Sequence, residues 1–207
     1  MKNSVIDELI EKYPLISGMV TKDQLFKILT SIKNILDKNV KGDIVELGCN
    51  VGTTSLFIRR FLIAYNSDKE FHVYDSFEGL PEKDTKDANN VDRQYSKGHC
   101  KTSKDCFMSN FKEAGLELPV IHKGWFSKQK YPEKIAFAFF DGDFYTSIMD
   151  SFKKVYPKLS KGAIVCIHDY DWDVLPGVRR ACDDFLKGKP EEGLIKSYYQ
   201  FGILEKK

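Results

Sequence analysis

Two short segments of the sequence place acidic and imidazole side chains directly after strongly apolar runs. Asp141 follows the apolar run 135–140, and His168 and Asp169 follow the run 163–167. Apolar runs of this length are typical of buried strands, and the carboxyl ends of parallel strands line the ligand crevice of an α/β sheet. Three such groups at neighbouring strand ends suit a metal ion, a proton-accepting group, or both. An enzyme is therefore the leading hypothesis.

A glycine-bearing turn after an earlier predicted strand indicates a second ligand-binding element. The turn contains Gly48, Asn50 and Gly52, and Thr53 begins the helix that follows. Glycines let the backbone turn tightly and approach a ligand at a helix start. The spacing matches neither a P-loop nor a G-x-G-x-x-G pattern, because Asn50 stands at the second glycine. Glu46, at the strand end, instead favours a ligand that carries an amine or a positive charge.

The next predicted strand ends at an acid that completes this element. Asp75 follows the predicted strand 71–74, and an acid at this place commonly accepts hydrogen bonds from ribose hydroxyls. Glu46, the glycine turn and Asp75 together suit S-adenosylmethionine, which offers an amino acid end, a sulfonium and a ribose.

Hydrophobic periodicity predicts strands that alternate with helices along the chain. This alternation implies a single α/β domain with a mostly parallel sheet and helices on both faces. The last two strands are too close for a crossover helix, so we expect an antiparallel hairpin at one sheet edge. We expect residues 1–40 to be N-terminal helices that pack on the core or the substrate side, and 41–207 to be the catalytic domain. The predicted helices are 5–12, 22–38, 53–65, 103–114, 146–156 and 176–186, and the predicted strands are 43–47, 71–74, 120–123, 135–140, 163–167, 194–199 and 202–205.

A polar segment between two of these elements is a candidate substrate loop. Residues 82–103 are charged and almost free of aliphatic side chains. Loops of this length without secondary structure are uncommon in compact domains and are usually either functional or disordered. We interpret the segment as a lid or substrate loop, with disorder as the alternative.

The composition argues against several other classes of protein. The chain has 207 residues, of which 42% are hydrophobic and 30% charged, and its formal net charge is +2, so no global field favours nucleic acid or an anionic membrane. The first residues carry acids and lysine where a signal peptide is apolar, and no window approaches the ~18 apolar residues of a membrane span. The five cysteines form no Cys-x-x-Cys pair, which suits reduced thiols and a cytoplasmic location.

Longer motifs resemble those of one enzyme family. The runs Asp-Ser-Phe-Glu-Gly-Leu-Pro at 75–81 and Asp-Gly-Asp-x-Tyr-x-Ser at 141–147 are the most specific. Over about residues 41–186 the chain resembles the macrocin O-methyltransferase (TylF-like) family. The resemblance implies a Rossmann-like methyltransferase fold with a seven-stranded sheet, S-adenosylmethionine as methyl donor, and a hydroxyl of a sugar, glycoside or phenol as acceptor in natural product or glycan biosynthesis. The other matching segments are 42–48, 123–126, 156–162 and 177–185.

The resemblance also implies roles for individual residues. The family binds a divalent cation, usually magnesium, through the first Asp of Asp-Gly-Asp and a later Asp-Asp pair. Carried over, the metal ligands are Asp141, His168 and Asp169, the metal is magnesium or manganese, and Asp141 is also the proposed base. Trp125 is implied near the adenine pocket. The predicted cofactor contacts are Glu46, Gly48, Asn50, Gly52, Thr53, Asp75, Ser76, Trp125 and Asp141.

His168 departs from this family pattern. Magnesium prefers oxygen ligands, whereas imidazole suits zinc, manganese or iron. Three outcomes stay open: an altered metal preference, a metal held by fewer side chains, or no metal, in which case a neutral His168 acts as the base. Asp143 is expected to point away from the site, as a helix cap or a support.

Other interpretations of the whole chain also stay open. One is a cation-dependent methyltransferase for catechols or other phenols. Another is a module that binds S-adenosylmethionine but has lost catalysis through His168. Tyr145, Tyr170 and Trp172 are candidates for the acceptor pocket, because aromatic faces stack on sugar or phenolic rings. The oligomeric state is left open between a monomer and a homo-oligomer.

Overall fold

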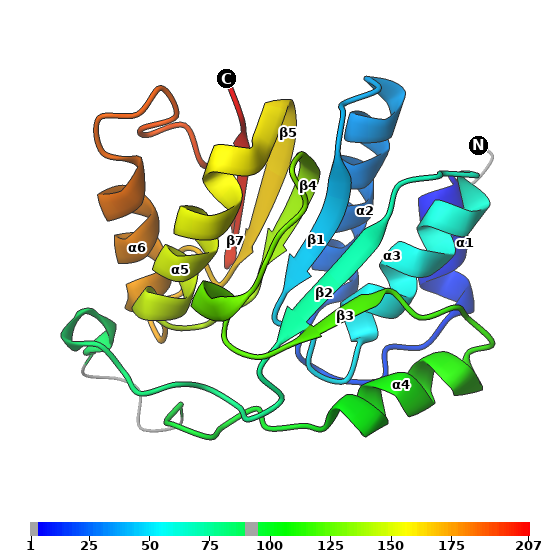
Figure 1. The fold of residues 1–207 in the computed structure, drawn as a ribbon, viewed down its shortest axis with the longest axis horizontal. Coiled ribbons are helices and arrows are strands. Elements are labelled where there is room, and N and C mark those ends of the chain that lie inside the picture. Colours follow the sequence, from blue (N-terminus) through cyan, green and yellow to red (C-terminus); the bar gives the residue numbers. More distant parts are fainter. Residues whose placement is uncertain (1–3, 90–94) are drawn as a thin grey trace.

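The computed structural model describes residues 4–89 and 95–207, and its frame is one seven-stranded sheet (Figure 1). The strands are β1 (Asp43–Leu47), β2 (Phe71–Asp75), β3 (Val120–Lys123), β4 (Ile135–Phe140), β5 (Leu159–His168), β6 (Lys196–Tyr198) and β7 (Phe201–Glu205). Their order is β3-β2-β1-β4-β5-β7-β6. The strands β1 to β5 pair in parallel, and β7 is antiparallel to both of its neighbours. The strand order therefore reverses between β1 and β4.

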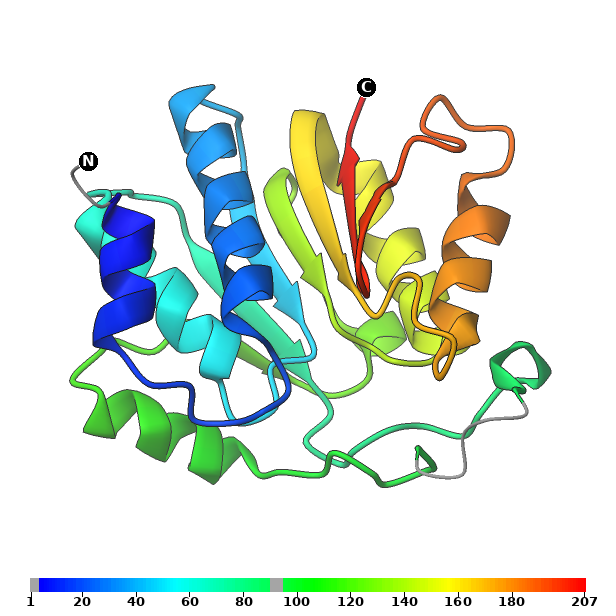
Figure 2. The ribbon, with the colours of Figure 1, turned by 180° about the vertical axis from the view of Figure 1, so that it is seen from behind.

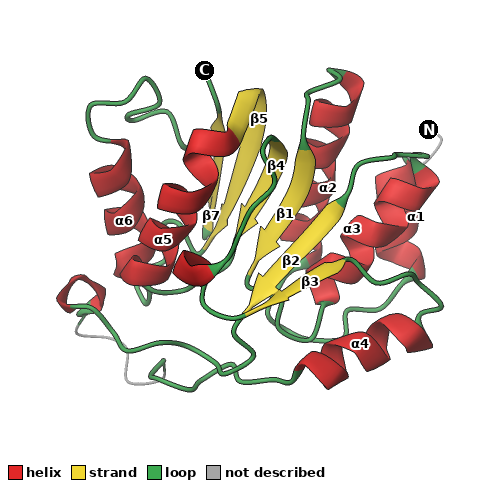
Figure 3. Ribbon diagram, viewed as in Figure 1, coloured by secondary structure: helices red, strands yellow, loops and turns green. Residues whose placement is uncertain are grey.

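Helices cover both faces of the sheet. One layer consists of α1 (Val5–Lys12), α2 (Lys22–Asp37) and α3 (Thr53–Ala64), and the other of α5 (Tyr145–Val155) and α6 (Pro176–Leu186) (Figure 2 and Figure 3). The helix α4 (Lys104–Glu113) lies near the carboxyl ends of the parallel strands (Figure 1). Three short 3-10 helices, η1 (Thr85–Asp87), η2 (Phe126–Lys128) and η3 (Tyr156–Lys158), lie in the connections.

Apolar side chains on both faces of the sheet hold the strands in place. All six residues of β4 are buried, as expected for the central strand of a parallel sheet. The helix α2 buries Leu25, Ile28, Leu29, Ile32 and Ile35, whose spacing of three and four residues forms one stripe along the helix. Burial of a side chain of this size contributes about 1.5–3 kcal/mol. The strand ends that carry the polar residues are therefore built on a rigid frame.

The two N-terminal helices begin with capping boxes. The side chains of Ser4 and Asp7 exchange hydrogen bonds with each other's backbone amides, and Thr21 and Gln24 do the same. These bonds satisfy amides that the first turn of a helix leaves free. The connection between α1 and α2 brings Met19 to the ligand pocket described below. The division of the chain at residue 40 stays a prediction.

The predicted helices and strands are confirmed in type and order, with differences at their ends. The strand β5 begins at Leu159 and not at residue 163, and β6 covers only part of the predicted strand 194–199. The predicted substrate loop 82–103 contains η1, and residues 90–94 of that loop lie outside the described residues. No helix in the described part of the chain combines the length and the apolar character that crossing a bilayer requires.

Candidate active site

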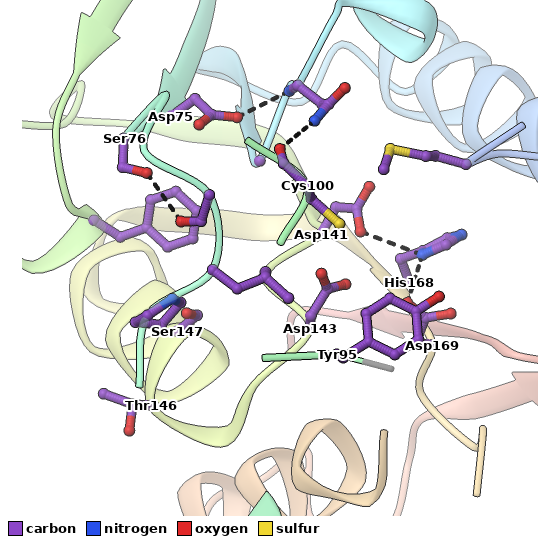
Figure 4. A pocket seen from close by; sticks show the side chains of 18 of the residues that line it. Asp75, Ser76, Tyr95, Cys100, Asp141, Asp143, Thr146, Ser147, His168 and Asp169 are labelled. Atoms are coloured by element: carbon purple, nitrogen blue, oxygen red, sulfur yellow. Dashed lines mark hydrogen bonds and ion pairs between the residues drawn. The ribbon is translucent and has the colours of Figure 1, made fainter. Parts of the chain in front are cut away.

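A pocket of about 470 Å³ opens where β1, β2, β4 and β5 end (Figure 4). Ligands of open α/β sheets bind at this edge, close to the point where the strand order reverses. The volume lies in the range of small-molecule sites. Residues from the strand ends, the α1–α2 connection, α5 and the segment 79–100 contribute to its walls.

His168 lies between two carboxylates at the end of β5. Its Nδ1 is 2.9 Å from Asp169 Oδ2 and 3.2 Å from Asp141 Oδ1 (Figure 4). Its Nε2 is buried and has no hydrogen-bond partner. The structure therefore brings together the three side chains that the sequence singled out. We call Asp141, His168 and Asp169 the acid–imidazole cluster.

The two carboxylates favour a protonated imidazole. Burial by itself lowers the pKa of His168, but the charges and hydrogen bonds of Asp141 and Asp169 outweigh it and raise the pKa well above its usual range. An imidazole that already carries a proton cannot accept one from a substrate hydroxyl. The hypothesis that neutral His168 acts as the base is therefore not supported by this environment. Asp141 is the better candidate for the base.

Asp143 lies in the pocket, contrary to the expectation that it points away from the site. Its φ of 58° is in the left-handed region, which breaks the alternation of the preceding strand. Burial, and then the charges of Asp141 and Asp169, raise the pKa of Asp143 well above its usual range. The protonated form of Asp143 is therefore favoured, and its side chain shares a hydrogen bond with Asp169. The start of α5 is capped instead by Asp87, whose Oδ1 accepts from the Tyr145 amide at 2.7 Å.

Asp75 joins the glycine turn to the loop that follows β2. Its Oδ2 accepts from the amides of Cys49 at 3.0 Å and Asn50 at 2.8 Å, and its Oδ1 accepts from the Phe77 amide at 2.7 Å. A carboxylate has about four acceptor positions, so one stays available for a ligand hydroxyl. The turn also requires glycine at position 48. The φ of Gly48 is 92°, and a Cβ there would lie 1.9 Å from the carbonyl oxygen of Asp141.

Three of the predicted cofactor contacts do not line the pocket. Glu46 is buried against α3, and its Oε2 accepts from the Ser55 hydroxyl at 2.5 Å. Burial raises the pKa of Glu46 to about 8, so the carboxyl is mostly neutral at pH 7 and does not supply the expected charge. The Thr53 hydroxyl is 2.7 Å from the Ser17 hydroxyl. Gly52 is the N-cap residue of α3. The other predicted contacts do line the pocket: Gly48, Asn50, Asp75, Ser76, Trp125 and Asp141.

Aromatic side chains supply much of the remaining wall. The rings of Tyr95 and Trp172 meet edge to face with centroids 5.9 Å apart, and both side chains line the pocket. The predicted Tyr145 and Tyr170 do not. Trp125 also lines the pocket and is 39% exposed. A partly exposed aromatic wall suits a ligand that presents a ring.

The polar segment after β2 is tied to the body of the protein at two places. At the first, the Arg180 guanidinium donates to the carbonyl oxygens of Lys86 and Ala88. At the second, the Leu80 amide donates to the His99 carbonyl at 2.8 Å, and Gly98 donates to the Leu80 carbonyl at 2.9 Å. Close to this second place, the side-chain amide of Asn50 donates to the Cys100 carbonyl at 2.7 Å. These ties bring Tyr95 and Cys100 to the pocket, which the sequence analysis did not predict, because polar loops carry no periodicity.

Comparison with known proteins decides the family. Residues 10–196 match the family described as macrocin O-methyltransferase (TylF). The chain belongs to this family. It is 32% identical over 189 residues to the mycinamicin III 3''-O-methyltransferase of Micromonospora griseorubida, an alignment that covers 84% of this chain and 72% of that protein. It is also 32% identical over 166 residues, 75% of this chain and 63% of that protein, to the 8-demethyl-8-(2,3-dimethoxy-alpha-L-rhamnosyl)-tetracenomycin-C 4'-O-methyltransferase of Streptomyces olivaceus.

Solved structures agree with the family. The O-methyltransferase NovP superposes with a TM-score of 0.79 at 25% identity, over 91% of this chain and 81% of that chain. The calicheamicin methyltransferase CalS11 superposes with a TM-score of 0.72 at 20% identity, over 97% of this chain and 89% of that chain, which supports the fold. The predicted Rossmann-like methyltransferase fold is confirmed, and the family makes the chain an S-adenosylmethionine-dependent O-methyltransferase.

The acid–imidazole cluster has a donor set that fits a divalent cation. Its ligand atoms lie within 4.8 Å of one another, and the nitrogen of His168 that faces the two carboxylates is Nδ1. Two carboxylates and one imidazole suit manganese or zinc better than magnesium. The side chains present are therefore compatible with the metal ligation that the sequence predicted.

Proposed function

We propose that this protein transfers the methyl group of S-adenosylmethionine to a hydroxyl group of a small glycoside, with a divalent cation in the acid–imidazole cluster. The observation that carries the proposal is the position of that cluster. It lies at the ends of β4 and β5, in the same pocket as the glycine turn and Asp75 at the ends of β1 and β2. S-adenosylmethionine, the methyl donor, would therefore lie on one side of the pocket and face the proton-accepting carboxylate on the other.

The names of the relatives support a sugar hydroxyl as the acceptor. One relative is named for a 3''-O-methyl transfer on mycinamicin III, and another for a 4'-O-methyl transfer on a rhamnosyl tetracenomycin. In this chain the aromatic wall formed by Tyr95 and Trp172 offers faces on which a sugar ring stacks. We assign this wall to the acceptor and the wall near Trp125 to the adenine.

Methyl transfer needs few chemical groups beyond correct placement. The hydroxyl oxygen attacks the sulfonium methyl in line, the new C–O bond forms as the C–S bond breaks, and the sulfur keeps the electron pair of that bond. Holding the two reactants together supplies most of the acceleration. Asp141 takes the hydroxyl proton as general base. A divalent cation bound by Asp141, His168 and Asp169 would lower the pKa of the hydroxyl.

His168 decides how a metal enters the cluster. The two carboxylates raise the pKa of its imidazole and so favour the protonated form, and a metal ligand must be deprotonated. Metal binding therefore releases a proton, and we expect the apparent affinity for manganese to rise as the pH rises.

Titration calorimetry with the purified protein tests the proposal. We expect S-adenosylmethionine to bind in the presence of EDTA, and manganese to give a separate isotherm that Asp141→Asn weakens at least tenfold, equivalent to about 1.4 kcal/mol. Asp150→Asn is the matched control, because Asp150 lines the same pocket but is not part of the cluster. Absence of cofactor binding under both conditions would refute the proposal.

An acceptor screen then separates the proposal from its alternatives. We expect mass spectrometry to detect one added methyl group on a glycoside with a free sugar hydroxyl, and Asp141→Asn to reduce kcat by about 10²–10⁴, the range for general bases. Methylation of catechols but of no glycoside would instead indicate a phenol methyltransferase. Cofactor binding without any turnover would indicate a binding module.

A further inference from the structure

A second group of ligand-type side chains lies at the opposite end of the sheet from the pocket. Asp43 begins β1, Glu70 immediately precedes β2, and His72 is the second residue of β2. Because β1 and β2 are parallel neighbours, these residues meet at the amino ends of the strands (Figure 1). Within residues 4–89 and 95–207, this group and the acid–imidazole cluster are the two that place three such ligand atoms within 4.8 Å of one another.

One nitrogen of His72 lacks the partner that its burial requires. The residue is 8% exposed, and its Nε2 is buried without a hydrogen bond. This nitrogen lies 3.3 Å from Glu70 Oε2 and 3.9 Å from Asp43 Oδ2, so it is directed at the two carboxylates. Buried polar atoms are nearly always paired. The unpaired nitrogen therefore points to a ligand that joins it to both oxygens.

We propose that Asp43, Glu70 and His72 bind a divalent transition-metal ion of the zinc type. In a tetrahedral site with bonds of about 2.0–2.1 Å, the ligand atoms lie ~3.4 Å apart. The distances of 3.3 Å and 3.9 Å from Nε2 are close to this value. One imidazole nitrogen and two carboxylate oxygens suit zinc better than magnesium or calcium, which prefer oxygen alone. The Glu70 side chain is 61% exposed, so water can reach the fourth position.

The other nitrogen of His72 has a partner that orients the ring for metal binding. Its Nδ1 is 3.2 Å from Nε2 of His122. With the proton on Nδ1, His72 donates to His122 and keeps the lone pair of Nε2 for a metal, the arrangement that metal-bound histidines adopt. His122 is itself held in a stack with Tyr74, with ring centroids 4.3 Å apart and planes at 6°.

The ammonium group of Lys69, next to Glu70 in the sequence, is bound elsewhere. Lys69 Nζ donates to the carbonyl oxygens of Val40 at 2.7 Å and Gly42 at 2.6 Å. Its hydrogen bonds therefore go to the backbone and not to Asp43 or His72, although its charge acts on Asp43. The competing occupant is a proton on Nε2, which would make His72 an imidazolium between the two carboxylates.

Nitrogen NMR of histidine-labelled protein distinguishes a metal from a proton. The chain has four histidines, and His72→Gln and His168→Gln assign the two ring signals that matter. On titration with zinc ions at fixed pH, we expect the Nε2 signal of His72 to move to the position of a metal-bound nitrogen. This shift should persist in Asp141→Asn, because the acid–imidazole cluster lies at the other end of the strands. A His72 signal that zinc leaves unchanged would overturn the proposal.

Equilibrium dialysis with zinc ions in the Asp141→Asn protein gives the second measurement. We expect Glu70→Gln, at a mostly exposed position where a folding defect is not expected, to weaken the remaining site at least tenfold. Glu133→Gln is the matched control, since the Glu133 side chain is 95% exposed and outside the group. Equal zinc affinity with and without Glu70→Gln would refute the assignment. Neither readout depends on methyl transfer, so the result is independent of the proposed function.

Discussion

Replacement of His168 by aspartate tests whether the positive charge of its imidazolium stabilises the acid–imidazole cluster. Nδ1 lies 2.9 Å from Asp169 and 3.2 Å from Asp141. At about 3 Å, two unit charges attract by about 1.4 kcal/mol even at the dielectric constant of water, and breaking a buried pair costs about 3–5 kcal/mol. We therefore expect His168→Asn to lower the free energy of unfolding by about 3 kcal/mol in EDTA. His168→Asp should lower it further, because attraction becomes repulsion.

The pH dependence of this loss has a defined sign. The folded pKa of His168 is raised above its unfolded value of about 6.5. The stabilisation is therefore fully present below about pH 6.5 and disappears as the pH rises through the folded pKa. The difference between the wild type and His168→Asn should accordingly be largest at about pH 6 and shrink at higher pH.

Urea unfolding in EDTA, repeated with added magnesium, measures both effects. We expect magnesium to restore much of the stability of His168→Asp, since that variant has the all-oxygen ligands that magnesium prefers. The control is His99→Asn at an exposed position, which should change little. If His168→Asp is as stable as the wild type at about pH 6 in EDTA, the imidazolium between two carboxylates does not exist and the electrostatic reasoning is wrong.

Three further predictions concern residues around the cluster. The pKa of Glu46 is raised from 4.5 to about 8, so the wild type should lose on the order of 5 kcal/mol of stability as the pH rises through that window. The Glu46→Gln variant, measured by urea unfolding, should not show this loss. Asp87→Ala should cost about 1 kcal/mol by removing the cap of α5, whereas Asp87→Asn should keep most of it; equal thermal stabilities would contradict the capping role. Trp172→Ala should raise KM for the acceptor and Trp125→Ala should raise KM for S-adenosylmethionine, and initial-rate kinetics that show the reverse would exchange the two walls.

The strands and helices followed from the sequence because burial repeats with the period of each element. The strand β4 is an uninterrupted apolar run, and α2 shows its buried stripe at helical spacing. The strand-end positions of Asp141, His168 and Asp169 followed from the same pattern, since residues after a buried run lie at the edge of the sheet. For these residues, local pattern and tertiary structure agree.

The errors arose where a side chain is directed by something outside its own segment. Asp143 was assigned to the wrong side because its left-handed backbone ends the alternation on which the prediction relied. Glu46 was expected to face the ligand, but its partner is Ser55 on the next helix. Asp87 caps α5 from a loop 58 residues away in sequence. Such contacts depend on the path of the chain through space and leave no periodic signal.

The two ties of the polar segment after β2 have a consequence for how the specificity of such an enzyme diverges. One tie is held by Arg180 and the cap at Asp87, and the other joins Leu80 to Gly98 and His99. A change in the number of residues between the ties costs little, since doubling the length of a loop costs only about 0.6 kcal/mol. Related enzymes can therefore acquire new acceptors by changing the residues between the ties, while the glycine turn and the ends of β4 and β5 keep their places in the sheet.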